Sequence, residues 1–127
     1  MTIDNAKAET LKTFSKAFNT NDISGTKACT TEDFQWIFYE GADAPYGHIY
    51  SGAEDACAAV VTREKRSLRK IEFSEVEEFQ SGDKVFTLYR ATGEFRDTGP
   101  FDVRAIDVYS FTQNRISCKD TYWKIVR

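Results

Sequence analysis

The sequence predicts an α+β fold in which three helices from the first half of the chain cover a cone-shaped, strongly bent, mixed or antiparallel sheet. Up to about residue 65, apolar side chains recur at steps of three and four. From residue 68 onward they alternate with polar residues, and turn-forming residues separate the alternating segments. The chain has 127 residues, the size of one domain, which we place at residues 1–127. A cone of this kind encloses a cavity that side chains must line.

The first two helices are predicted from apolar spacing and from a capping residue. Residues 3–20 are expected to be helical because Leu11, Phe14 and Phe18 fall on one stripe of a helix. The pattern breaks after this stripe, and Asp22 is placed to cap a short second helix that ends near residue 30. Both helices belong to the layer that covers the sheet.

A strand, a loop and a third helix complete the first half. Residues 34–39 are expected to form a strand, because aromatic residues occupy every second position from Phe34. Residues 40–50 contain two glycines and a proline, which predict a loop. The sequence Ser51-Gly-Ala-Glu54 has the pattern of a capping box and predicts a third helix that ends near residue 65.

Four long strands are predicted in the second half, over residues 68–79, 83–96, 101–111 and 115–126. Three turn sequences separate them, namely Ser81-Gly-Asp83, Thr98-Gly-Pro100 and Gln113-Asn114. In the last of these turns, Asn114 can supply the positive φ that a tight hairpin needs. The strands are therefore expected to be joined by hairpins.

Charge and composition exclude several classes of function. The net charge is −3, so bulk charge predicts neither a nucleic-acid partner nor an anionic membrane partner. No apolar run is long enough to cross a membrane, and the first residues lack the apolar stretch of a signal peptide. The three cysteines are far apart and odd in number, which predicts free thiols and a cytoplasmic location.

Metal and cofactor chemistry are not expected from the residue types present. The chain has one histidine and no pair of cysteines at metal-binding spacing, so no metal site is predicted. It also lacks the sequence patterns of nucleotide and dinucleotide sites and of common hydrolases and metalloproteases. The sequence therefore predicts no cofactor, and acid–base chemistry on a small organic molecule requires none.

Asp107 is the first candidate for a catalytic residue. Strand alternation places it on one face with four apolar or aromatic neighbours, Val103, Ala105, Tyr109 and Phe111. If this face lines the cavity, burial favours the neutral carboxyl, which can donate a hydrogen bond to a developing oxyanion or act as a general acid. Alternatively, the face meets solvent, or an arginine or tyrosine satisfies a structural carboxylate.

Asp120 and His48 are the other catalytic candidates. Asp120 is expected to share a strand face with Ile116, Cys118 and Tyr122, and to approach Asp107 on the neighbouring strand. The alternative is a strand-end charge paired with a basic neighbour. His48 lies in the predicted loop and could serve as a general base opposite Asp107, because an imidazole titrates near neutral pH. The alternative is a surface histidine.

Aromatic residues are the candidates for binding a ligand. Four of them could line an apolar pocket: Phe14, Phe18, Trp36 and Phe38. Three tyrosines could also donate hydrogen bonds to a ligand: Tyr46, Tyr50 and Tyr109. All seven could equally be packing residues, since the wall of the core and the wall of a pocket are one surface in a cone.

The order of elements resembles that of the nuclear transport factor 2-like superfamily, which includes the SnoaL-like cyclases and the ketosteroid isomerases. Residues 18–23 (Phe-Asn-Thr-Asn-Asp-Ile) look like the helix break of this superfamily, and residues 50–56 (Tyr-Ser-Gly-Ala-Glu-Asp-Ala) look like the start of its third helix. Residues 104–111 with Arg115 and Ile116 look like its last hairpin. The resemblance covers nearly the whole chain and implies the same cone-shaped fold.

The resemblance also carries over to single positions. Asp107 matches the aspartate that forms part of the oxyanion hole in ketosteroid isomerases. Phe14 stands where those enzymes have a tyrosine on the first helix. Phe38 stands at, or next to, the position of their catalytic base. A phenylalanine can neither donate nor accept a proton, so the steroid isomerase mechanism is not expected here.

The function expected is therefore that of a small-molecule pocket protein. The favoured form is a cofactor-independent acid–base enzyme of the SnoaL-like kind: an isomerase, cyclase, dehydratase or hydrolase acting on an apolar, oxygen-bearing substrate. The alternatives are a non-catalytic binding protein and a protein-interaction module on the same fold. The resemblance also implies a homodimer formed through the outer face of the sheet, where Ile106 and Val108 would otherwise meet water.

Overall fold

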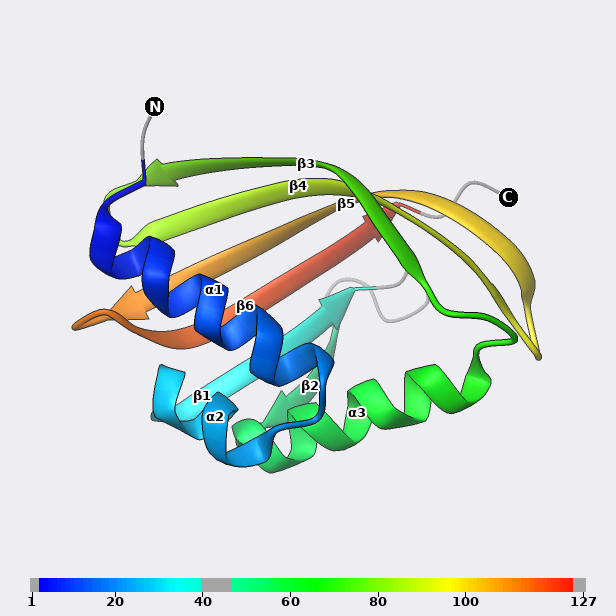
Figure 1. Cartoon of the computed structure of the whole chain (residues 1–127), viewed down its shortest axis with the longest axis horizontal. Helices are drawn as coiled ribbons and strands as arrows, with labels where there is room; N and C mark the ends of the chain where they lie inside the picture. The colour runs from blue at the N-terminus through cyan, green and yellow to red at the C-terminus, as the bar shows by residue number, and fades with distance from the viewer. Residues whose placement is uncertain (1–2, 40–46, 125–127) are drawn as a thin grey trace.

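A computed structural model describes residues 3–39 and 47–124 (Figure 1). Within these residues three helices and six strands form an α+β fold, with a single sheet in the order β2-β1-β6-β5-β4-β3. The sheet is strongly bent, and its long strands arch over α1 (Figure 1). The predicted fold class is thereby confirmed. Among the described helices, none is long and apolar enough to span a membrane.

The helices α1 (Asn5–Asn19) and α2 (Ile23–Cys29) form as their sequences predict. The stripe of α1 is buried, and Phe14 and Phe18 stack with their ring centroids 4.9 Å apart. Asp22 caps α2, since its carboxylate accepts a hydrogen bond of 2.9 Å from the backbone N–H of Gly25. Local spacing and capping were therefore sufficient to predict both elements.

The helix α3 (Gly52–Arg66) also forms where it was predicted, but its capping box does not. The Ser51 side chain makes no capping hydrogen bond, and Glu54 instead pairs with Lys27 at 2.9 Å. Ser51 is the last residue of a strand and lies opposite Gln35. Glu54, the other half of the expected capping box, is thus held by Lys27 of α2, a contact between two helices that the local pattern does not contain.

The strands β1 (Thr30–Tyr39) and β2 (His48–Ser51) form one end of the sheet. The end of the predicted loop, from His48 onward, is therefore a short strand, which pairs antiparallel with β1 from Gln35 to Phe38. On its other side β1 runs parallel to the last strand. The sheet is therefore mixed, and only the pairing with β1 explains why so short a segment is extended.

The remaining strands are β3 (Glu72–Ser81), β4 (Lys84–Phe95), β5 (Gly99–Thr112) and β6 (Arg115–Lys124). Each pairs antiparallel with the next, as the turn sequences predict. The tight turns use positive φ at Gly82 and Asn114, of 58° and 65°. The first strand of this group begins at Glu72, later than predicted, because the chain bends at residues 68–69 after an isolated bridge between Ser67 and Phe95.

Irregular pairing in the long strands decides which side chains point inward. The register of β5 against β6 shifts between Ser110 and Phe111, and the register of β3 against β4 shifts between Ser74 and Glu77. On the concave face β5 buries the alternating set that was predicted, namely Val103, Ala105, Asp107, Tyr109 and Phe111. In β6 the inward set after the shift is Lys119, Thr121 and Trp123. The concave face and α1 enclose the space in which the site lies.

Candidate functional site

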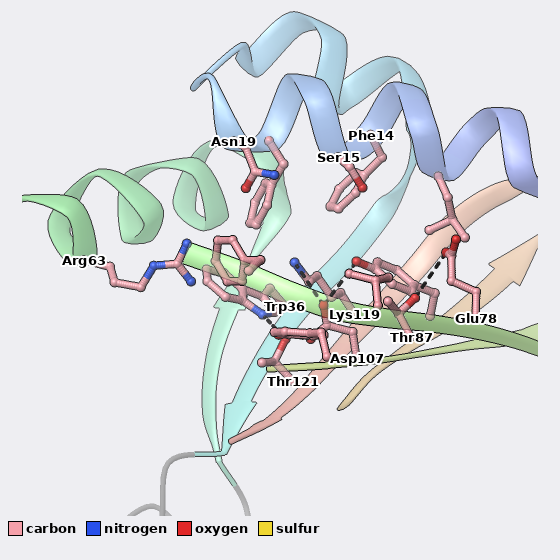
Figure 2. Close-up of a pocket in the computed structure, with 16 residues that line it drawn as sticks. Phe14, Ser15, Asn19, Trp36, Arg63, Glu78, Thr87, Asp107, Lys119 and Thr121 are labelled. Atoms are coloured by element: carbon pink, nitrogen blue, oxygen red, sulfur yellow. Dashed lines mark hydrogen bonds and ion pairs between the residues drawn. The ribbon is translucent and has the colours of Figure 1, made fainter. Parts of the chain in front are cut away.

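A cavity of about 270 Å³ lies between α1 and the concave face of the sheet (Figure 2). Its apolar wall is aromatic and includes Phe14, Phe18, Trp36 and Tyr109. Among the described residues, its charged lining consists of two basic and two acidic side chains, Arg63, Lys119, Glu78 and Asp107. The cavity therefore combines an apolar surface with balanced charge.

The Asp107 carboxylate lies on the floor of this cavity, and its side chain is 8% exposed. Its Oδ1 accepts a hydrogen bond of 2.9 Å from the Tyr89 hydroxyl, and its Oδ2 accepts one of 3.4 Å from the Tyr109 hydroxyl. Trp123 Nε1 in turn donates to the Tyr89 hydroxyl at 3.3 Å. The two hydroxyls thereby fix the orientation of the carboxylate, and the Trp123 indole in turn orients the Tyr89 hydroxyl.

Both tyrosines remain hydrogen-bond donors. Burial, followed by the nearby Asp107 charge, raises the pKa of Tyr89 well above its usual range. The same two causes raise the pKa of Tyr109. Deprotonation of either hydroxyl beside a carboxylate would place two negative charges together away from water. The tyrosines therefore position Asp107 and do not compete with it as bases.

Lys119 extends from β6 into the same cavity (Figure 2). Its Nζ lies 3.8 Å from Asp107 Oδ2, within ion-pair range but beyond a direct hydrogen bond. Four rings surround this nitrogen, with centroids 4.5 Å (Phe18), 5.2 Å (Trp36), 5.6 Å (Phe14) and 5.7 Å (Tyr109) away. Burial lowers the pKa of Lys119, Asp107 opposes this change, and Arg63 adds to it.

Neighbouring contacts fix the orientation of the cavity wall. Trp36 Nε1 donates a hydrogen bond of 2.8 Å to Thr121 Oγ1, which holds the indole ring beside the Lys119 nitrogen. On the opposite side, Thr87 Oγ1 donates to Glu78 Oε2 at 3.4 Å. The Asp107–Lys119 pair thus faces a pre-formed space whose wall is held by one buried and one exposed hydrogen bond.

The structure brings together five of the site residues predicted from the sequence. Asp107, Phe14, Phe18, Trp36 and Tyr109 all line the cavity. Phe38 and Tyr50 line a smaller neighbouring cavity of about 150 Å³, to which Trp36 and Arg63 also contribute. Tyr46 lies outside the described residues.

His48 and Asp120 do not line the cavity. His48 is exposed on the edge strand β2 and stacks on Tyr50, with ring centroids 4.6 Å apart. Asp120 lies opposite Val108 on the outer face of the sheet, whereas Asp107 lies opposite Thr121 on the inner face. The expectation that the two aspartates approach each other is therefore wrong, because side chains on neighbouring strands meet only when they share a face.

The shift in register explains this misplacement. Ile116 is buried, but the irregularity beside it changes which later residues of β6 point inward. The outward Asp120 accepts a weak hydrogen bond from Cys118 Sγ at 3.7 Å, and burial raises the pKa of the Asp120 carboxyl. Burial and the Asp120 charge raise the pKa of Cys118 to about 11. Neither group reaches the cavity.

Four further residues line the cavity and were not predicted to do so: Lys119, Arg63, Tyr89 and Glu78. Arg63 was part of a basic run at the end of α3, and Glu78 was part of an acidic strand, so both had simple explanations as surface residues. One signal could have revealed Lys119. It shares its strand parity with Trp123, whose large aromatic side chain would be expected to point inward.

The arrangement can move a proton and stabilise a negative oxygen. Asp107 Oδ1 is held firmly by Tyr89, while Oδ2 has only longer contacts and faces Lys119. A carboxylate in this position can accept a proton, and a cation beside it can neutralise charge that develops on a carbonyl oxygen. Among residues 3–39 and 47–124, no group of three or more histidine, cysteine, aspartate or glutamate residues could hold a metal ion.

Comparisons with known proteins agree with this architecture. The sequence profile of the SnoaL-like domain matches residues 11–118. The fold is similar to that of a nuclear transport factor 2-like protein from Burkholderia xenovorans, with TM-score 0.75 and 21% identity over 96% of this chain and 92% of that one. It is also similar to one from Burkholderia pseudomallei, with TM-score 0.73 and 17% identity over 95% and 92% of the two chains.

A third similar structure contains a bound small molecule. This protein from Catenulispora acidiphila has a ketosteroid isomerase-like fold and was solved in complex with trimethylamine. Its TM-score is 0.68, with 14% identity over 91% of this chain and 85% of that one. No curated protein matches the sequence. Identities this low establish a shared fold and leave the chemistry to be argued from the residues of the cavity.

Proposed function

We propose that this chain, which belongs to the SnoaL-like domain family, is a cofactor-independent acid–base enzyme that moves a proton next to the carbonyl group of an apolar substrate. The family supports a pocket that binds a small molecule. The finer assignment rests on one observation, the buried Asp107–Lys119 pair at 3.8 Å inside an aromatic cavity. The balanced charge of the lining favours a substrate without net charge.

The proposed reaction is an isomerisation through an enolate. Asp107 Oδ2 takes a proton from the carbon next to the carbonyl, and the electrons of the C–H bond move onto the carbonyl oxygen. The Lys119 ammonium stabilises the resulting negative oxygen. Asp107 then returns its proton to another carbon of the same enolate, so atoms and electrons balance without a co-reactant.

This assignment changes the roles expected from the sequence. Asp107 was expected to polarise the substrate oxygen, with His48 or Asp120 moving the proton. Tyr89 holds Asp107 Oδ1, whereas Oδ2 has only longer contacts and faces Lys119 inside the cavity, which places Oδ2 to act as the base. Lys119 is the group best placed to polarise the oxygen, since it lies beside the base in the same cavity.

The test is proton exchange on a simple apolar ketone. Wild-type protein in D₂O is expected to accelerate the exchange of the protons next to the carbonyl of cyclohexanone, followed by NMR. Asp107→Asn should lose about a hundredfold or more of this rate, whereas Asp120→Asn on the outer face should keep it. Lys119→Met is a second variant and should also lose rate. Circular dichroism checks that each variant is folded.

Two outcomes would contradict the proposal. The first is that cyclohexanone and larger cyclic ketones quench the fluorescence of Trp36 at the cavity wall while no exchange is accelerated. This result would favour the alternative of a non-catalytic binding protein. The second is exchange that survives in Asp107→Asn, which would move the base elsewhere.

The expected homodimer stays a prediction. The outer face carries apolar and aromatic side chains that favour it, with Tyr39 and Tyr122 stacked at 4.3 Å beside Ile106. Tyr122 is among the exposed large hydrophobic residues, and burying it against a second copy would be favourable. Such a dimer would leave the concave face, and hence the proposed active site, within each subunit.

A further inference from the structure

The surroundings of the Lys119 nitrogen are unusual for a lysine. Among the described residues, its one counter-charge is Asp107 Oδ2, 3.8 Å away and too far for a direct hydrogen bond. Four aromatic rings also lie close to the nitrogen, and the nearest centroid, that of Phe18, is 4.5 Å away. An ammonium normally keeps several hydrogen bonds to water or to acceptors. Here the nitrogen faces a cavity large enough to admit a small molecule.

We propose that Lys119 is a nucleophile that captures a carbonyl substrate as a covalent iminium. The inference deepens the proposed function and rests on it, because the same carbonyl group and the same proton transfer are involved. Lys119 Nζ would attack the carbonyl carbon directly from the cavity wall. The aromatic rings that surround the nitrogen would hold the apolar body of the substrate.

The charged groups around the cavity favour a reactive amine. Burial and the Arg63 guanidinium on α3 lower the pKa of Lys119, while Asp107 on β5 opposes them. Glu78 on β3 lines the same cavity, and Tyr89 and Tyr109 face the carboxylate from β4 and β5. A lysine with a lowered pKa holds more neutral amine at neutral pH, and the neutral amine is the form that attacks.

The proposed step balances without an oxidant or reductant. The Lys119 ammonium first gives one proton to Asp107 Oδ2, which leaves a neutral amine beside a protonated carboxyl. The neutral amine forms a C–N bond to the carbonyl carbon as the C=O π bond breaks, and a proton moves from nitrogen to the former carbonyl oxygen. The proton held by Asp107 then lets this oxygen leave as water, so that the iminium and the Asp107 carboxylate remain. The positive iminium attracts electrons from the neighbouring carbon more strongly than a carbonyl does. Asp107 can then take a proton from that carbon, as in the proposed isomerisation.

The experiment traps the iminium by reduction. Wild-type protein is incubated with cyclohexanone and sodium cyanoborohydride near neutral pH, and its intact mass and peptide map are measured. We expect one reduced cyclohexyl group on Lys119, formed about tenfold faster than on the exposed Lys12 and Lys16, because burial lowers the pKa of Lys119 and the cavity holds the ketone beside its nitrogen. Labelling of Lys119 no faster than of these two lysines would overturn the proposal.

A matched variant separates covalent capture from a purely electrostatic role. Lys119→Arg keeps the positive charge, but a guanidinium forms no iminium under these conditions. We expect this variant to lose both the adduct and the accelerated proton exchange. If Lys119→Arg does not fold, Lys119→Met serves in its place for the adduct, since an apolar side chain fits the aromatic surroundings.

The two proposals fail in different ways. Exchange by the wild type without a trapped adduct, together with exchange retained in Lys119→Arg, would overturn covalent capture and keep the proposed function. An adduct at Lys119 without exchange would support capture and overturn the isomerase assignment. Absence of both adduct and exchange would overturn both.

Discussion

The protein carries two groups of paired charges, one inside the cone and one on its outer face. The difference between them indicates where an acid–base reaction can take place. The inner pair is Asp107 and Lys119, whose side chains are 8% and 11% exposed. The outer cluster comprises Glu75, Arg90, Asp102 and Arg104, which are 43% to 61% exposed. The shortest contact of the outer cluster, between Arg90 and Asp102, is 2.6 Å, whereas the inner pair is separated by 3.8 Å.

Contact distance is therefore a poor guide to the free energy that an ion pair contributes to stability. Water and salt screen the outer cluster, so its short hydrogen bonds contribute little to stability. The inner pair has lost most of its water, and each member depends on the other and on the tyrosines for compensation. Breaking the longer, inner contact is therefore expected to change the free energy of unfolding more than breaking the shorter, outer one. The charged groups that can take part in a reaction are those inside the cavity.

The largest effect is expected when the inner pair is broken. Asp107→Asn should lower the free energy of unfolding by about 3 kcal/mol at pH 7, because Lys119 is left buried without its counter-charge. Urea unfolding measures the change, with an unchanged m-value as the check that the unfolded state is the same.

Adding Lys119→Met to Asp107→Asn should recover most of the loss. Asp120→Asn is the control on the outer face and should lose far less. An unchanged stability of Asp107→Asn would mean that the carboxylate is poorly compensated in the folded protein.

A smaller effect is expected in the pH dependence of stability. The pKa of Lys119 is lower in the folded protein than its usual value of 10.5, so the unfolded chain binds more protons between these two values. Stability from this group should therefore rise with pH up to about 10.5. The measurement is the difference in unfolding free energy between wild type and Lys119→Met across this pH range. The contributions of other titrating groups largely cancel in this difference. A difference that falls with pH would show that the Asp107 charge outweighs burial.

The smallest effect is expected in the outer cluster. Arg90, through its hydrogen bonds, lowers the pKa of Asp102, but both side chains are open to solvent. Asp102→Asn should leave the urea midpoint at pH 7 unchanged within experimental error, both at low salt and at high salt. A loss comparable with that of Asp107→Asn would contradict the distinction between the two groups of charges.

The fold was largely predictable because most of its signals are local. The apolar stripe of α1, the Asp22 cap of α2 and the Asn114 turn each act within a few residues of chain. The strand β2 was missed because its extended shape depends on pairing with β1, which brings His48 beside Phe38. In the expected capping box, Glu54 pairs instead with Lys27, a tertiary contact that the four-residue pattern does not specify.

For the site, the position of Asp107 among apolar residues could be predicted, because alternation along one strand is a local property. Which charged side chains lie beside Asp107 depends on tertiary packing. A shift in the register of β5 against β6 turns Lys119 into the cavity and Asp120 away from it. Such a shift depends on how two strands and the helices beneath them pack together. A change of one residue in register moves a side chain to the other face, so the partner of Asp107 depends on packing that no short stretch of sequence specifies.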